Sequence, residues 1–443
     1  MCLFQGKTVL NKFKEIVEAN PQIYNEDYLR LKEEIAQSPL RHGGLPIRFI
    51  YNPLFFSKQE INLLDSACNQ LAVILDKVTQ EYLRNKNFRQ AFGFSQELEE
   101  LILIDPGYGE NFPMARFDIF YDFDTGSLKF CELNADGSSG MTKSLLLDEK
   151  LSQSKPIKII RNDWQVTYLN PVDSWIEALL ENYANFRGTG GKPTIAIMDV
   201  NCWKQGMVTE FQEFQRKLKE QGYTAVICDP RELKFREEKL YFHDKPVDLI
   251  YRRAVTSDLL EIYAEIADLV EAVKKKAVCL VGAFRSQIIH NKKIFALLHN
   301  PQLTDFLRKE EQEFIKKFIP FTQIFTEKIK PEILKNRERW VLKPLDSYQS
   351  QGVYIGRDYT WETWQEIVNN IPPGEYLVQE FVEVPKLELV DFREGKLVKK
   401  NYNQMIGLFM YNKKFSGFYT RVSPLNNVAS GLGAVAVANL ICN

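Results

Sequence analysis

Hydrophobic and polar residues alternate along the chain with periods that predict both helices and strands. In the first hundred residues, hydrophobic residues recur at helical spacing, as in residues 57–87, which predicts a mainly helical region. The stretches "ARFDIFYDF" and "SLKFCELN" instead alternate with a period of two and are joined by "DTG". This pattern is typical of a β-hairpin.

Strand and helix patterns alternate between residues 186 and 288. Two helices are predicted, and Ser257 or Asp258 would cap the second one, which spans 257–276. The predicted strands are "TIAIMDV", "YTAVICDP", "VDLIYRRAV" and "AVCLVGA". Such alternation favours a small parallel-sheet α/β unit.

The last third of the chain is rich in strand patterns, which predict an antiparallel sheet with long strands. The predicted strands are "WVLKPL", "GVYIG", "YLVQEFV", "LELVDF", "LVKKNYNQMIGLFMY" and "FSGFYTRVS". The most hydrophobic run, residues 428–442, is shorter than the ~20 residues of a membrane helix and contains Ser, Gly and Asn, so we expect it to be buried protein interior.

A chain of 443 residues is too long for one ordinary hydrophobic core. The patterns predict a mixed α/β fold of four parts, the helical region, the hairpin, the parallel unit and the strand-rich end. We place them at residues 1–110, 111–185, 186–288 and 289–443.

Net charge and the numbers of cysteine and histidine residues limit the kinds of ligand and partner that we expect. The formal net charge is −1, so the chain has no overall field that would attract nucleic acid or a membrane surface. The seven cysteines form no CxxC pair and there are only four histidines, which argues against a zinc site and favours reduced thiols in a cytoplasmic protein. Lysines at positions 7, 12 and 14 interrupt the N-terminal hydrophobic run, so we expect no signal peptide.

The predicted hairpin carries polar side chains at positions that share a face. Arg116 and Asp118 are two residues apart on one strand, and Glu132 and Asn134 on the other. If these faces coincide, the two carboxylates repel unless one is protonated, an arginine neutralises them or a divalent cation lies between them. Asp, Glu and Asn oxygens suit Mg²⁺, whose remaining ligands are often substrate phosphates. The alternative is a structural ion pair on an exposed sheet face.

Other polar residues interrupt the C-terminal strands. Lys343 lies in an otherwise hydrophobic strand, where it could bind an anion such as phosphate or extend its amine to solvent. Gln379 and Glu380 could bind the edge of a purine or face water, and Arg421 at a strand end could be a surface residue. The chain contains no GxxxxGK[ST] loop.

The ordered set of these motifs resembles the circularly permuted ATP-grasp enzymes, and within them the glutathionylspermidine synthetase-like family. The Glu-x-Asn strand comes before Lys343, the reverse of the usual ATP-grasp order. The matching stretches, which span residues 116 to about 440, are "RFDIFYD", "KFCELNAD", "IYRR", "HNKKIFALL", "WVLKPLDSYQSQGVYIG", "YLVQEFVEVPK" and "GFYTRVS".

The resemblance implies antiparallel sheets that clamp ATP, a small parallel α/β unit of the preATP-grasp type, and an ATP- and Mg²⁺-dependent carboxylate–amine ligase. Such an enzyme forms an amide or peptide bond between small-molecule or peptide substrates through an acyl phosphate and releases ADP and phosphate. It implies that Asp118, Glu132 and Asn134 bind Mg²⁺ and that Arg116 stabilises charge on the transferred phosphoryl group. The remaining roles fall to phosphate-binding Lys293 and Lys343, adenine-contacting Gln379 and Glu380, and Arg421 at the reaction centre.

Two stretches depart from the family pattern. "ADGSSGMTKS" follows Asn134 and makes Ser138 and Ser139 candidate substrate contacts, and the phosphate-covering loop at 346–352 has one glycine. Arg252 and Arg253 could bind a substrate carboxylate, or form structural ion pairs. Two alternative functions stay open, a non-catalytic nucleotide- or peptide-binding module and, ranked last, a metal-dependent phosphohydrolase that uses Asp118 and Glu132.

Overall fold

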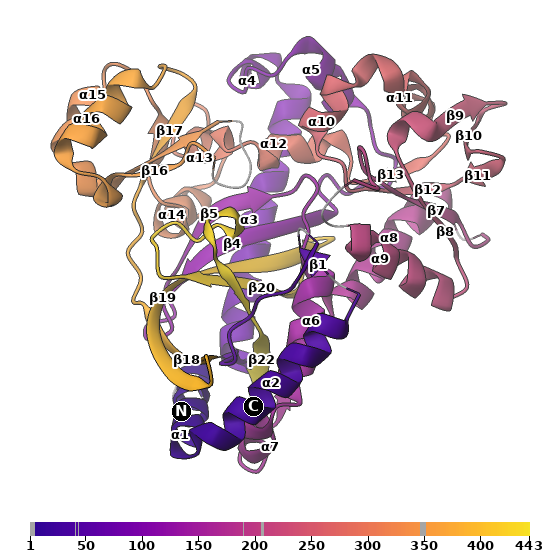
Figure 1. The fold of residues 1–443 in the computed structure, drawn as a ribbon. Helices are drawn as coiled ribbons and strands as arrows, with labels where there is room; N and C mark the ends of the chain where they lie inside the picture. Colours follow the sequence, from indigo (N-terminus) through magenta and orange to yellow (C-terminus); the bar gives the residue numbers. More distant parts are fainter. Residues whose placement is uncertain (1–4, 40, 43, 189, 205–207, 346–350) are drawn as a thin grey trace.

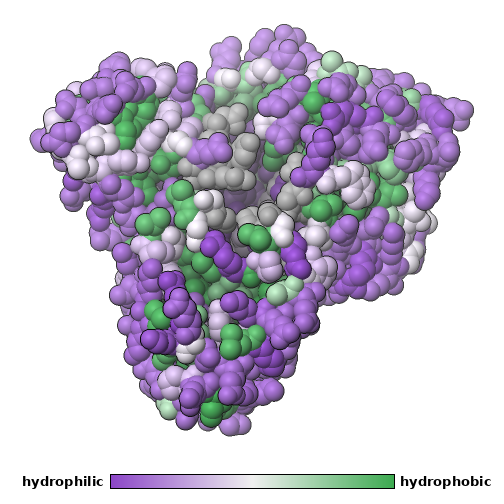
Figure 2. All heavy atoms as spheres, viewed as in Figure 1, coloured by the Kyte–Doolittle hydropathy of each residue, from purple (hydrophilic) through white to green (hydrophobic). Residues whose placement is uncertain are grey.

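The protein is described as a computed structural model covering residues 5–39, 41–42, 44–188, 190–204, 208–345 and 351–443. Figure 1 shows a central antiparallel sheet, a smaller lobe on one side that contains β14–β17, and an α/β unit on the other side. Helices α1 and α2 lie at the end of the molecule where both termini are found. Figure 2 shows this face as mainly hydrophilic, with hydrophobic side chains gathered toward the middle, where the lobes meet.

The central sheet has six strands in the order β21-β20-β19-β4-β5, with β18 paired to β19, and all its pairings are antiparallel. It therefore joins the hairpin β4–β5 to the C-terminal strands, some 290 residues away in sequence. Its strands are β4 Met114–Tyr121, β5 Leu128–Asn134, β18 Leu387–Arg393, β19 Lys396–Tyr411, β20 Lys414–Ser423 and β21 Val435–Val437.

Alternate residues of β4 point to opposite faces of the central sheet. Ala115, Phe117, Ile119 and Tyr121 face the largest hydrophobic core, which leaves the intervening residues on the opposite face. The N-terminal helices share that core with the sheet. They are α1 Gln5–Ala19, α2 Pro21–Gln37, α3 Lys58–Arg84, α4 Lys86–Gln90 and α5 Gln96–Leu103.

A small sheet joins the C-terminal strand to two earlier parts of the chain. The C-terminal strand β22 (Asn439–Cys442) pairs in parallel with β3 (Leu54–Ser57) and antiparallel with β6 (Val166–Thr167). Leu440 and Cys442 are buried in the main core, so most of the hydrophobic run 428–442 is interior, as predicted. A short hairpin, β1 Arg41–His42 and β2 Leu45–Pro46, precedes it.

The strand-rich C-terminal third was predicted as one antiparallel sheet, and this is wrong. Its first strands form a separate four-stranded sheet in the order β14-β17-β15-β16, with its own core around Trp340 and Trp364. The elements of this lobe are β14 Thr322–Ile324, α15 Lys330–Lys335, η4 Arg337–Arg339, β15 Trp340–Pro344, β16 Tyr354–Ile355, η5 Gly356–Asp358, α16 Trp361–Asn370 and β17 Tyr376–Glu380. Two hydrophobic strand sets with the same period give no sign in the sequence that they pair in different sheets.

The predicted parallel unit is confirmed, with strand order β13-β12-β7-β8. The expected single helix over 257–276 is wrong, because it is divided into α10, a 3₁₀ turn and α11, and Val255 is its N-cap residue. The elements are β7 Thr194–Met198, α9 Val208–Glu220, β8 Thr224–Cys228, η1 Pro230–Glu232, β9 Leu233–Arg236, β10 Lys239–Phe242, β11 Lys245–Val247, β12 Leu249–Arg252, α10 Thr256–Glu261, η2 Tyr263–Ile266, α11 Ala267–Lys274 and β13 Cys279–Val281.

Further helices link these parts. They are α6 Met141–Ser152, α7 Lys155–Ile160, α8 Pro171–Arg187, η3 Phe284–Ser286, α12 Gln287–His290, α13 Lys293–Leu298, α14 Lys309–Phe318 and η6 Ser430–Leu432. None of the helices in the described ranges is both long and hydrophobic enough to cross a bilayer. The six cysteines of the described chain are all free and buried. The four domain boundaries drawn from the sequence stay a prediction.

Candidate active site

The polar residues of the hairpin do share one face of the central sheet. Asp118 is paired with Glu132 and Arg116 with Asn134. A β-bulge makes this possible, because the register shifts so that Ile119 is paired with Phe130 and Cys131 is the extra residue. Without the bulge, Glu132 and Asn134 would follow Phe130 onto the hydrophobic core. The bulge therefore turns both polar groups toward Arg116 and Asp118.

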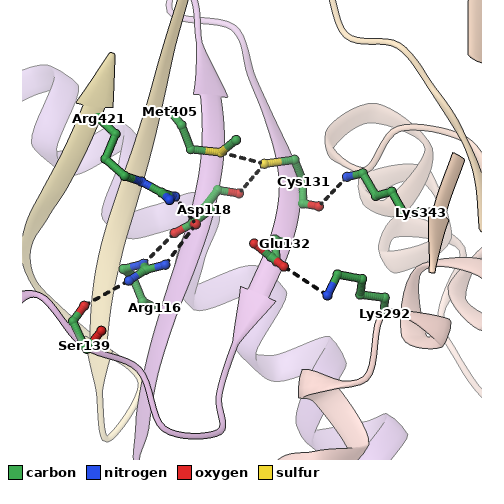
Figure 3. Close-up of polar contacts among 9 residues, drawn as sticks. All are labelled: Arg116, Asp118, Cys131, Glu132, Ser139, Lys292, Lys343, Met405 and Arg421. Carbon is green, nitrogen blue, oxygen red and sulfur yellow. Dashed lines mark hydrogen bonds and ion pairs between the residues drawn. The ribbon is translucent and has the colours of Figure 1, made fainter. Parts of the chain in front are cut away.

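Asp118 is fully buried and is held by two arginines. Arg116 donates to both of its carboxylate oxygens, at 2.7 and 3.1 Å, and Arg421 donates to Oδ2 at 2.9 Å (Figure 3). Burial by itself would lower the pKa of Arg116, but Asp118 outweighs it and raises that pKa. Of the three ways in which the carboxylates could coexist, the structure uses arginine neutralisation for Asp118.

The close packing of this ion pair depends on Gly407. Gly407 lies on β19 directly opposite Asp118, and a Cβ at this position would be 2.6 Å from Arg116 Cδ and 2.9 Å from Asp118 Oδ1. These distances are shorter than any normal contact, so the glycine leaves the space that the two side chains fill. Sequence reasoning missed Gly407, because a lone glycine in a strand does not reveal which side chain lies over it.

We expect Gly407→Ala to displace Arg116 and Asp118 and to lower both stability and ligand-dependent activity. Inserting a methyl group into a packed site typically costs about 1–3 kcal/mol of unfolding free energy. Thermal unfolding and ADP release measure the two effects. Gly431→Ala is the matched control, since a Cβ there would contact nothing within 4 Å. Equal behaviour of the two variants would contradict this view of the site.

Glu132 lies opposite Asp118 and faces cations rather than another carboxylate. Lys292 Nζ is 3.3 Å from Glu132 Oε1. Burial would raise the pKa of the Glu132 carboxyl, but Lys292, Lys343, Arg116 and Arg421 together lower it to about 2. Glu132 is therefore ionised at neutral pH.

Lys343 links the two antiparallel sheets at the site. It projects from β15 and donates to Gln379 Oε1 at 2.7 Å. It also donates to the backbone oxygen of Cys131 on β5 at 3.3 Å (Figure 3). Gln379 in turn donates to Thr322 at 3.0 Å. Burial lowers the pKa of Lys343. The lysine thus lies on the side of the four-stranded sheet that faces Glu132.

Two residues that the sequence did not single out, Lys143 and Tyr419, lie beside the two arginines of the site. The ring of Tyr419 lies between three cations, with Lys143 Nζ 5.0 Å, the Arg116 guanidinium 5.2 Å and the Arg421 guanidinium 5.6 Å from its centroid. Burial would raise the pKa of the Tyr419 hydroxyl, but Lys143 and the two arginines lower it. Tyr419 precedes Arg421 by two residues on β20, which is the signal that could have found it.

The donor set fits Mg²⁺ in part. Glu132 is ionised, and the buried amide nitrogen of Asn134 has no hydrogen-bond acceptor among the described residues. The oxygen and nitrogen of an amide exchange places by a simple rotation, so Asn134 can offer an oxygen to a cation at this point. Both oxygens of Asp118 already accept from arginines. No group of three or more His, Cys, Asp or Glu residues in the described chain is placed so that it could hold a metal ion, so phosphate oxygens would have to supply further ligands.

Two predicted nucleotide contacts lie elsewhere. Lys293 donates to the backbone oxygen of Phe92 at 2.7 Å, and its neighbour Lys292 is the one that faces Glu132. Adjacent lysines at the start of a helix point in different directions, so the motif alone could not separate them. Glu380 is paired with Trp340 on the face opposite Gln379 and lies 3.4 Å from Arg339.

The predicted substrate residues divide into two kinds. Arg252 is fully buried, donates to backbone oxygens around it and pairs with Asp136 at 2.5 Å, so it is structural and not available to a substrate. Arg253 forms no hydrogen bond or ion pair through its side chain with any described residue. The backbone oxygen of Ser139 accepts from Arg116 at 2.9 Å, and Ser138 is buried beside it. Residues 346–350 of the predicted covering loop lie outside the described residues.

Comparisons with known proteins agree with this architecture. The profile of the family described as circularly permuted ATP-grasp type 2 matches residues 214–419, just under half of the chain. The structure is similar to that of a glutathione synthetase-like effector from Globodera pallida in its apo form, with a TM-score of 0.60, 13% identity and coverage of 95% of this chain and 97% of that one. No curated protein sequence matches the chain.

A putative γ-glutamylcysteine synthetase from Methylobacillus flagellatus KT gives a TM-score of 0.46 at 12% identity, over 87% of this chain and 89% of that one. The mixed α/β architecture predicted from the sequence, with several antiparallel sheets and one parallel sheet, is confirmed, and it is consistent with the circularly permuted ATP-grasp fold. The match to the family profile does not reach the hairpin, so the roles of its residues stay predictions.

Proposed function

We propose that this protein is an ATP- and Mg²⁺-dependent carboxylate–amine ligase. It phosphorylates a substrate carboxylate and joins the activated acyl group to an amine, with release of ADP and phosphate. The ATP-grasp fold supports nucleotide binding, and the arrangement of charges between the two antiparallel sheets supports phosphoryl transfer.

The observation that carries the proposal is the excess of positive charge at the site. Within the described chain, five cationic side chains surround two carboxylates, those of Asp118 and Glu132. The cations are Arg116, Lys143, Lys292, Lys343 and Arg421. A group of buried and partly buried cations that outnumbers the carboxylates favours an anionic ligand, and a nucleoside triphosphate provides one.

Phosphoryl transfer requires positioning and positive charge rather than a protein nucleophile. Lys343 and Lys292 would hold the phosphates, while Arg116 and Arg421, oriented by Asp118, would stabilise the charge on the transferred group. Mg²⁺, held by Glu132 and Asn134 with phosphate oxygens, would neutralise charge between the phosphates. The substrate carboxylate oxygen attacks the γ-phosphorus and displaces ADP; the amine nitrogen then attacks the acyl carbon, phosphate leaves and the amine loses a proton.

A cavity beside this site has a size suited to the nucleoside. It measures about 630 Å³, which lies in the range of small-molecule sites. Its walls include Phe120, Asn403 and the linker 381–386, which directly follows Gln379 and Glu380. The other polar walls are Arg357, Glu383, Lys386, Gln404 and Asn426. A purine could pack on the hydrophobic side chains, and the ribose hydroxyls could bind the polar ones.

The test of the proposal is ADP release that requires both a carboxylate and an amine. A coupled assay with Mg²⁺-ATP and panels of amino acids, short peptides and amines should detect stimulated turnover. ATP binding without any stimulated turnover would favour a non-catalytic binding module. Turnover that needs no amine and yields free phosphate would favour a phosphohydrolase. Absence of ATP binding would overturn the proposal.

We expect Lys343→Met to weaken ATP binding about 10- to 100-fold, because it removes a charge-assisted hydrogen bond to phosphate. Isothermal titration with a non-hydrolysable ATP analogue measures this directly. Lys399→Met is the control, since Lys399 lies at the far end of β19 and pairs with Glu18. If both variants bind the analogue as the unchanged protein does, Lys343 is not a phosphate ligand.

Membership of the narrower glutathionylspermidine synthetase-like group remains part of this proposal, as does a cytoplasmic location. Neither implies that glutathione or spermidine is the substrate. The names of the two structural neighbours refer to those proteins, and their identities of 13% and 12% do not carry substrates over to this chain.

A further inference from the structure

The parallel sheet ends beside the loop that follows the hairpin. Asp199 follows β7 and Arg253 follows β12, the two neighbouring central strands of this sheet. In open α/β sheets, ligands bind at the carboxyl ends of such strands. The Arg253 N–H donates to the backbone oxygen of Met198 at 2.9 Å, so Arg253 and Asp199 leave the sheet side by side.

The side chain of Arg253 forms no hydrogen bond or ion pair with any described residue. Its Nε is buried and unbonded, and its guanidinium makes no ion pair within the described residues. Its neighbour Arg252, by contrast, is bound on several sides. Leaving a partly buried arginine unpaired is unfavourable, so Arg253 is suited to an anion that comes from outside the protein.

Two carboxylates lie near Arg253 without pairing to it. Asp199 is 5% exposed, and burial raises its pKa to about 6, while Arg253 opposes this shift. Asp258 on α10 also has a raised pKa, chiefly through burial, and Arg253 again opposes it. Neither carboxylate forms an ion pair with a described residue. A cation and two carboxylates that form no ion pair with one another match the charges of a ligand that carries both an anionic and a cationic group.

We propose that Arg253 and Asp199 bind the α-carboxylate and α-ammonium groups of an amino-acid substrate, whose distal carboxylate is the one phosphorylated. Asp258 is the second acceptor for the ammonium group. This inference rests on the proposed ligase function. It adds the class of substrate and its orientation, with the α groups at Arg253 and Asp199 and the distal carboxylate at the phosphorylation site.

The short loop between the two sites sets the length of this substrate. A Cβ on Gly137 would lie 2.8 Å from the Arg253 guanidinium, and Ser139 accepts from Arg116. Two residues of chain span at most ~7 Å, which together with one contact at each end sets an upper limit to the separation of the Arg253 and Arg116 guanidinium groups. An acidic amino acid, or a dipeptide with an amino-acid end and a distal carboxylate, has a length within this limit.

The loop between Asp136 and Thr142 is held at both ends by hydrogen bonds and an ion pair, so the separation of Arg253 and Arg116 is fixed. Asp136 pairs with Arg252 and accepts from the backbone N–H of Thr256 at 2.7 Å. Because Thr256 is the first residue of α10, this hydrogen bond also satisfies an N–H group at the start of that helix. At the other end, Gly140 and Thr142 donate to Glu210 from α9. The departure from the family pattern in "ADGSSG" therefore lies where the two ends of the proposed substrate would be held.

The first experiment compares three probes that share a distal carboxylate. L-Glutamate keeps both α groups, 4-aminobutyrate lacks the α-carboxylate and glutarate lacks the α-ammonium. L-Aspartate and γ- and α-linked dipeptides of glutamate extend the series. Titration calorimetry in the presence of a non-hydrolysable ATP analogue, and ADP release with an amine panel, should show binding and turnover only for probes with both α groups. Equal responses to 4-aminobutyrate or glutarate, or binding of none of the probes, would overturn the proposal.

The second experiment uses variants of the two residues. Arg253→Gln and Asp199→Asn should each raise the KM for the responding amino acid about 10- to 100-fold, the effect of losing a hydrogen bond to a charged group. The KM for ATP and the thermal midpoint should be unchanged. Arg236→Gln is the control, because Arg236 lies in an exposed hairpin of the same unit and pairs with Asp244. An unchanged KM in Arg253→Gln would contradict the assignment.

The two proposals fail in different ways. If the unchanged protein does not bind the ATP analogue, the ligase function is wrong, whereas amino-acid binding can still be measured by calorimetry. If ATP is bound and turnover is stimulated by carboxylates without an α-amino group, the ligase function stands and the amino-acid site is wrong.

Discussion

Replacing Glu132 by glutamine should reduce substrate-stimulated ADP release by about 100- to 1,000-fold, the range for loss of one electrostatic contact in a phosphoryl or acyl transfer site. The variant keeps the shape of the side chain and removes only its charge. Because Glu132 is the ionised carboxylate that would hold Mg²⁺ beside Lys292 and Lys343, its loss would weaken metal binding at the site. Turnover measured against Mg²⁺ concentration should show the loss as a weaker response to the metal.

The matched control is Glu388→Gln, since Glu388 lies on β18 and pairs with Lys14 far from the site. If Glu132→Gln turns over at the normal rate, Glu132 is a structural partner of Lys292 only. The pH dependence separates these roles as well. The pKa of Glu132 is lowered to about 2 from a usual value of 4.5, so its contribution to stability is present above pH 4.5 and is lost as the pH falls toward 2. No change in activity between pH 5 and 8 should come from this carboxyl.

The sequence was sufficient to place the polar residues on two paired strands, because strand alternation and a short turn determine which side chains share a face. It could not show the bulge at Cys131, which turns Glu132 and Asn134 away from the core. A bulge depends on the pairing of the whole sheet, and the central strand β19 that fixes this pairing is distant in sequence. For the same reason the space provided by Gly407 was not predictable.

The sequence predicted that two close carboxylates would repel each other unless a proton, an arginine or a divalent cation compensated them, and the structure shows compensation by arginine for Asp118. Each carboxylate is surrounded by cations that come from other elements, Arg421 from β20 for Asp118 and Lys292 and Lys343 for Glu132. A charge pattern within one hairpin cannot include partners that tertiary contacts bring to it. The directions of the Lys293 and Glu380 side chains were unpredictable for the same reason, since the direction of a side chain depends on what packs around its helix or strand.

Replacing Asp118 by asparagine is expected to cost about 3–5 kcal/mol of unfolding free energy, a much larger loss than a metal ligand on an open surface would cause. Removing one member of a buried ion pair leaves the other charge without compensation. Here two buried arginines would lose their shared acceptor, because Arg116 and Arg421 both donate to Asp118. Chemical denaturation measures the change, and the mid-point should fall with little change in slope.

The double variant Asp118→Asn/Arg421→Met separates the structural role from a catalytic one. If Asp118 acts by holding the arginines, removing Arg421 as well should recover part of the lost stability, while activity stays low because the charge for the transferred phosphoryl group is gone. If Asp118 is mainly a metal ligand, the single variant should unfold near the normal denaturant concentration, and Mg²⁺ affinity should fall instead. The two readouts, stability without metal and metal response of turnover, therefore assign Asp118 to the ion pair or to the metal.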